Sequence, residues 1–123
     1  MVFDILKLAV IFTLIDSIYL YSMSSNFQKM IKTIQGSELK MAIIPTFLCY
    51  VFLIILLYYF IVLKKQSVFD AFILGLSVYG VYETTNLAIF KKWNPSIGIV
   101  DTIWGGILFS LSYFFYLKLN KIL

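Results

Sequence analysis

Three acidic side chains, Asp16, Glu83 and Asp101, lie within stretches of the sequence that are otherwise apolar. An acid at the centre of a membrane-spanning helix costs roughly 2.5–3.5 kcal/mol on insertion-based scales, and less near the helix ends. Each carboxyl group therefore needs a hydrogen-bond partner, a proton or water. The acids either hold helices together or bind a proton, a cation or a small polar molecule, because ionisable groups inside membranes are functional candidates by default.

Two of the acids lie in similar pentapeptides. Residues 15–19 (Ile-Asp-Ser-Ile-Tyr) and residues 100–104 (Val-Asp-Thr-Ile-Trp) both read aliphatic, Asp, hydroxyl, Ile, aromatic. They fall in the first and the last apolar runs, which we expect to cross the membrane in opposite directions. Asp16 and Asp101 are therefore expected at a similar depth.

Small and polar residues lie at helical spacing from the acids. Together with the acids, they are expected to form a polar seam between the helices. Gly80 and Gly105 would let helices approach closely, and nearby hydroxyl and amide groups would satisfy the acids. We expect Trp104 at the edge of the seam. The predicted intramembrane binding cluster comprises Thr13, Asp16, Tyr79, Glu83, Asn86, Asp101 and Trp104.

No catalytic residue, metal site or cofactor is predicted. The chain has no His, and its single cysteine, Cys49, lies in an apolar run, so the commonest zinc ligands and an intramolecular disulfide are both missing. Paired acids can perform acid–base chemistry, but no activated nucleophile accompanies them. An enzymatic role is therefore the least favoured alternative.

The composition is typical of a multi-pass integral membrane protein. Of 123 residues, 62% are hydrophobic and 13% are charged, whereas soluble domains are about 45–50% apolar and about 25% charged. The net charge is +4, and the lysines are scattered rather than clustered. We therefore expect membrane lipid as a partner, and no nucleic acid.

Four apolar runs are long enough to cross a bilayer. The sequence predicts one all-α domain over residues 1–123, a four-transmembrane-helix up-down bundle. The predicted spans are near residues 3–22, 41–63, 68–90 and 97–117.

The segment between the first two spans is the only extended polar one. Phe27, Met30, Ile31 and Ile34 recur at helical spacing there, which predicts a short separate helix lying in the membrane interface and ended by Gly36. Aromatic residues near span ends are expected to anchor the chain at the membrane surface; Trp93 is one of them.

This topology brings the three acids into one half of the membrane, within roughly 10 Å of one face at 1.5 Å per residue. Like charges at one depth favour a shared proton or a bound cation. The lysines divide evenly between the two faces, so the positive-inside rule does not give the orientation.

Residues 82–88 (YETTNLA), Lys92-Trp93 and residues 100–105 (VDTIWG) resemble the signature of domain of unknown function 2177, a family of small predicted membrane proteins. The resemblance extends over nearly the whole chain. Glu83 stands where Asp is more frequent in that family, and Tyr19 where Trp is usual; both replacements keep the chemistry. The resemblance implies a four-span membrane protein and brings no established activity, ligand or catalytic residue.

Three classes of function remain open. The favoured one is a small transport or permeation protein whose acidic cluster handles a proton, a cation or a small polar solute. The alternatives are an assembly protein whose acids are helix-packing contacts, and a lipid-active membrane enzyme with a pocket lined by Glu83 and Asp101. Because four helices make a narrow bundle, we also expect a closed homo-oligomer.

Overall fold

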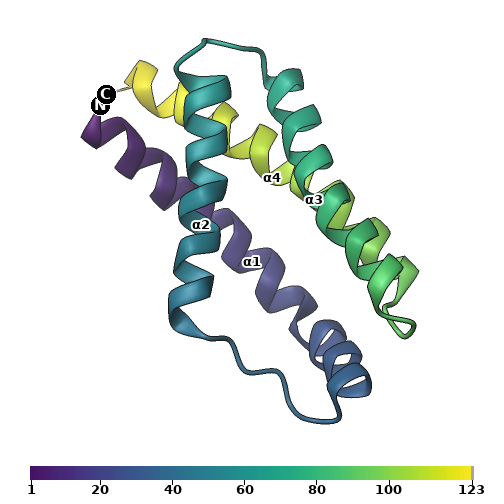
Figure 1. Cartoon of the computed structure of the whole chain (residues 1–123). Helices are drawn as coiled ribbons and strands as arrows, with labels where there is room; N and C mark the ends of the chain where they lie inside the picture. Colours follow the sequence, from purple (N-terminus) through teal and green to yellow (C-terminus); the bar gives the residue numbers. More distant parts are fainter. Residues whose placement is uncertain (123) are drawn as a thin grey trace.

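The computed structural model describes residues 1–122, and all its regular secondary structure is helical within that range. The helices run alternately up and down, so both termini lie at the same end (Figure 1). α2 continues into a π-helical segment, η1. The elements are α1 (Val2–Gln35), α2 (Ile43–Leu57), η1 (Tyr58–Val62), α3 (Val68–Ile89) and α4 (Pro95–Ile122).

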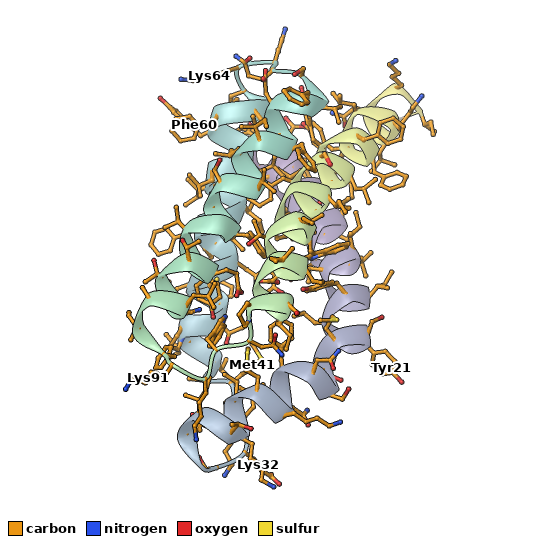
Figure 2. The ribbon with its side chains drawn as sticks, turned by 90° about the vertical axis from the view of Figure 1, so that its right-hand side faces the viewer. Tyr21, Lys32, Met41, Phe60, Lys64 and Lys91 are labelled. Atoms are coloured by element: carbon orange, nitrogen blue, oxygen red, sulfur yellow. The ribbon has the colours of Figure 1, made fainter. Side chains whose placement is uncertain are left out.

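The first apolar run and the polar segment after it form one continuous helix, α1. The prediction of a separate interfacial helix is therefore wrong, because no Gly or Pro interrupts the chain before Gly36. The predicted end is confirmed: Gly36 adopts a left-handed conformation (φ 74°), and its N–H donates to the Lys32 carbonyl. Figure 2 shows the last turns, which carry Lys32, bending away from the line of the helix through Tyr21.

Two of the helices are long and apolar enough to cross a membrane by length and composition alone. They are α2 with its π-helical continuation, Ile43–Val62, and α4, Pro95–Ile122. The other two predicted spans are helical, but this criterion does not identify them as membrane-crossing. The structure therefore establishes an all-helical chain with two membrane-capable helices over residues 1–122.

α3 and α4 pack more closely than any other pair of helices. A Cβ atom on Gly105 would collide with the Tyr79 ring, and one on Gly106 would lie 2.7 Å from the Phe72 ring. The two glycines thus allow aromatic rings of α3 to lie directly on the α4 backbone. This close contact fixes the position of Glu83 on α3 relative to Asp101 on α4.

The apolar core joins α4 to both α1 and α2. Phe12 and Phe109 are fully buried, with their rings edge to face at 5.6 Å. Near the end where the termini lie, the Tyr113 hydroxyl donates to the Gln66 carbonyl at 2.6 Å, which ties the α2–α3 turn to α4. α2 packs mainly against α1, and its first turns border a cavity.

Candidate functional site

Asp16 and Asp101 are buried where α1 crosses α4, with 4% and 6% of their surfaces exposed. The indole N–H of Trp104 donates to Asp16 Oδ1 at 2.9 Å, and the Tyr19 hydroxyl donates to Asp101 Oδ1 at 3.0 Å. The aromatic residue of each pentapeptide thus binds the aspartate of the other. Helical i, i+3 spacing on two antiparallel helices produces this exchange, because it places each aromatic side chain opposite the other helix's acid.

The two aromatic rings also contact each other. Tyr19 and Trp104 stack with centroids 4.6 Å apart and an interplanar angle of 5°. We call these two rings and their two aspartates the α1–α4 clasp. It joins the first helix to the last through two hydrogen bonds and one stacking contact.

Asp16 has a second donor from a third helix. The Tyr50 hydroxyl of α2 donates to Asp16 Oδ2, while Trp104 occupies Oδ1. Both carboxylate oxygens of Asp16 are therefore hydrogen-bonded, and the side chain connects α1, α2 and α4. Fully satisfied buried polar groups of this kind fix how helices pack.

Glu83 is the most deeply buried of the three acids, with 1% of its surface exposed. The indole N–H of Trp93 donates to Glu83 Oε1 at 2.7 Å. Trp93 lies in the α3–α4 turn and precedes Asn94, whose side chain accepts from the Ser96 N–H at 2.8 Å and caps α4. Glu83 Oε2 has no hydrogen-bond partner among the described residues.

Glu83 and Asp101 are neighbours across the α3–α4 contact, close enough for the charge of one carboxyl group to influence the other. Two ionised carboxylates are acceptors only, so a bond between them requires a proton on one of them. Asp16 is also close enough to Asp101 for the two charges to repel each other. The one ion pair within residues 1–122 joins the amino terminus to Asp4 at 3.7 Å, so no lysine neutralises the three acids.

The acids form a row rather than a single point. In the part of the chain that the structure describes, no three His, Cys, Asp or Glu side chains are close enough to share one metal ion. Asp101 neighbours both other acids: the clasp joins it to Asp16, and Glu83 adjoins it from α3.

A cavity of about 830 Å³ lies beside this row. It is bounded by the later turns of α1, the first turns of α2 and part of α3, and most of its lining side chains are apolar or aromatic. Asp16 and Asp101 contribute the acidic part of its wall, and Cys49 also lines it. The volume lies within the range of small-molecule sites, about 300–1,000 Å³.

The other residues of the predicted cluster take different positions. Tyr79 lines the cavity and lies over Gly105. Asn86 is one turn beyond Glu83, with a buried amide nitrogen that has no partner among the described residues. Thr13 lies apart: it is exposed and lines a second, apolar cavity of about 410 Å³ between α1 and α2.

Sequence reasoning missed three aromatic donors to the acids. Trp93 was expected at the membrane surface but binds Glu83 instead, and Tyr19 and Tyr50 bind Asp101 and Asp16. The equivalent positions of Tyr19 and Trp104 in the two pentapeptides were a usable signal for one of them. No sequence pattern connects Tyr50 with Asp16, which lies 34 residues away on another helix.

The model of a family described as "Predicted membrane protein (DUF2177)" matches residues 1–116. The match includes both pentapeptides, Glu83 and Trp93. No curated protein matches the chain, and neither does any solved structure.

Proposed function

The chain belongs to this DUF2177 family of predicted membrane proteins, and from that premise we propose that it is a four-span transport or permeation protein whose acids bind a proton or a cation. The observation that carries the proposal is the Glu83–Asp101 pair. Both acids are buried, no lysine of the described chain pairs with them, and one Glu83 oxygen has no partner. A proton or a cation shared by the pair would satisfy it.

Outward-facing apolar side chains support insertion of the two helices that length and composition do not identify. On α1, Leu6, Val10, Leu14 and Ile18 recur every fourth residue, and each is 55–71% exposed. α3 likewise exposes Phe69, Val81 and Ile89. A lipid environment would cover these stripes, whereas water would leave a large apolar patch exposed.

Charged residues lie at the two ends of the bundle. Figure 2 shows Lys64 at one end and Lys32 and Lys91 at the other, with apolar side chains between them. The Lys64 ammonium lies 4.8 Å from the Tyr59 ring centroid, an arrangement that suits the interface between lipid and water. This distribution supports all four helices crossing together.

The proposed mechanism uses the neighbouring positions of the acids. A proton or a cation entering through the cavity would meet Asp101 in its wall and be shared with Glu83 behind it. Asp16 would keep α1, α2 and α4 in place, because both its oxygens are already hydrogen-bonded.

A flux measurement tests the proposal. Purified protein is reconstituted in liposomes that contain a pH-sensitive dye or, in a parallel set, a cation-sensitive dye, and a potassium diffusion potential is applied. We expect proton or cation flux from the wild type and about background flux from Glu83→Gln. Asp70→Asn is the matched control, because Asp70 is a surface acid of the same helix that caps its first turn. Equal flux from wild type and Glu83→Gln would refute the role of the pair.

An assembly role is the second candidate, and Asp16 favours it. Its two bonds, to Trp104 and Tyr50, are those expected of a helix-packing contact. Loss of folding in every acid-to-amide variant, with no flux from folded wild type, would support this candidate against transport.

We further propose that the chain forms a closed homo-oligomer, because most assemblies of identical chains are symmetric and much apolar surface of each helix is free. Cross-linking in membranes at low protein density should recover a defined oligomer. Recovery of monomer alone would contradict it.

A further inference from the structure

The cavity beside the acids has an unusual lining for an apolar site. Two carboxylates, Asp16 and Asp101, lie in its wall, and none of its lining residues is a lysine. Aromatic side chains from α1, α2, α3 and the α3–α4 turn also line it; they are Tyr19, Tyr21, Phe27, Tyr50, Tyr79, Tyr82 and Trp93.

A lining of aromatic rings and acids, without a lysine, favours a positively charged ligand. The face of an aromatic ring attracts positive charge, and aromatic cages are the usual site for quaternary ammonium groups. The carboxylates add the same preference, and like charge would repel an anion. The lining also includes Ser24, Gln28 and Thr46, but most of its exposed surface is apolar, which disfavours a small hydrated ion.

We propose that this cavity binds an amphipathic organic cation, with its apolar body among the aromatic and aliphatic side chains and its charge toward Asp101. The volume of about 830 Å³ accommodates a ligand much larger than a metal ion or a proton. The inference rests on the proposed transport function and names its substrate class.

The polar anchor is Asp101 rather than Asp16. Both oxygens of Asp16 already accept hydrogen bonds, from Trp104 and Tyr50, whereas Tyr19 is the one side-chain donor that the structure gives to Asp101. The unpartnered Oε2 of Glu83 lies behind Asp101 and adds negative charge next to it. A cation in the cavity therefore meets Asp101, whose carboxylate can still accept a further hydrogen bond or ionic contact.

Cys49 supplies the reporter for a direct test. It is the single cysteine of the chain and it lines the cavity. The probe is tetraphenylphosphonium, and tetraphenylborate is its anion of the same shape. In nanodiscs, the rate at which a maleimide labels Cys49 is measured with each ion.

We expect tetraphenylphosphonium to protect Cys49. At about ten times its Kd, mass action leaves about a tenth of the sites free, so labelling slows about tenfold. Tetraphenylborate should not slow it. The positional control is Ser25→Cys in a Cys49→Ala background, since Ser25 is exposed and outside the cavity; neither ion should slow its labelling. No protection by the cation, or equal protection by the anion, would overturn the proposal.

Two variants locate the bound charge. Asp101→Asn should raise the tetraphenylphosphonium concentration for half-protection by about tenfold or more, because a desolvated charge partner is lost. If that variant fails to fold, Tyr82→Leu replaces it, since Tyr82 lines the cavity without bonding an acid. Tyr59→Leu, an exposed tyrosine outside the cavity, is its control. Unchanged protection in folded Asp101→Asn and in Tyr82→Leu would overturn the proposed site.

The two proposals fail separately. Proton or inorganic cation flux without binding of tetraphenylphosphonium would retain the transport function and overturn this substrate class. Binding of tetraphenylphosphonium without any flux in the liposome measurement would retain the site and overturn transport.

Discussion

Tyr19 and Trp104 stack face to face between α1 and α4, and each donates a hydrogen bond to the aspartate that precedes the other ring by three residues. Similar pentapeptides on antiparallel helices thus form a locally symmetric contact. The contact buries Asp16 and Asp101 without any lysine. Both acids line a cavity; Asp101 also adjoins Glu83, and Asp16 holds three helices together.

The clasp should contribute measurably to folding stability. Tyr19→Phe keeps the stacked ring but removes the hydroxyl that donates to Asp101. A buried acceptor left without its partner costs about 1–3 kcal/mol, so the free energy of unfolding in mixed micelles should fall by that amount. Tyr21→Phe, at the exposed Tyr21, is the control and should be neutral. An unchanged free energy of unfolding in Tyr19→Phe would show that the Tyr19–Asp101 hydrogen bond does not contribute to stability.

Amide substitution should lower the folding stability at Asp16 but not at Glu83. In Asp16→Asn, an NH₂ group replaces one of two acceptors and faces the donor of Trp104 or Tyr50, so we expect a loss of about 1–3 kcal/mol of unfolding free energy. In Glu83→Gln, the amide nitrogen can take the place of the unpartnered Oε2 and donate to Asp101, so stability should be retained. Glu83→Lys, with no room for a hydrated ammonium, should not fold. Denaturation gives the values for Asp16→Asn and Glu83→Gln, and the yield of folded protein reports on Glu83→Lys. Greater loss in Glu83→Gln than in Asp16→Asn would contradict these roles of the two acids.

Replacing Gly105 by alanine should destabilise the α3–α4 contact more than replacing Gly80. Gly105→Ala forces a methyl group into the Tyr79 ring, whereas a Cβ on Gly80 would lie 3.5 Å from the Thr102 methyl, an ordinary contact. Overpacking costs typically about 1–3 kcal/mol. We expect thermal unfolding of Gly105→Ala at a clearly lower temperature and a near-wild-type value for Gly80→Ala. Equal unfolding temperatures would mean that the helices separate easily to admit the methyl group.

The proposed four crossings would place the connections on alternating sides of the membrane. Reporters at the loop of residues 36–42 and at the turn of residues 63–67 should report opposite sides, and the two termini should report the same side as that turn. Cysteine labelling from outside intact cells, in a Cys49→Ala background, gives the answer. If the reporters at residues 36–42 and 63–67 label from the same side, the four-span topology is wrong.

The apolar runs were sufficient to predict an all-helical chain, because continuous hydrophobic stretches of this length form helices. The continuity of α1 was not predicted. The polar composition after Ser22 was interpreted as the start of a separate helix, but it marks only a change of environment along one helix. Burial of the three acids followed from their cost in lipid. Their donors did not, because Tyr50 and Trp93 reach the acids through tertiary packing that no local pattern encodes. Thr13 was misplaced because helical spacing alone does not say which neighbour α1 meets on each face.

The most direct test of the account is the flux through Asp101 variants in liposomes, measured at equal amounts of folded protein. Asp101→Asn keeps the size of the side chain and an acceptor for Tyr19 but removes the charge, so we expect flux at background. Asp101→Glu keeps the charge and should restore part of the wild-type flux, while Asp70→Asn should leave it unchanged. Wild-type flux from folded Asp101→Asn would contradict the claim that the buried acids carry the transported charge.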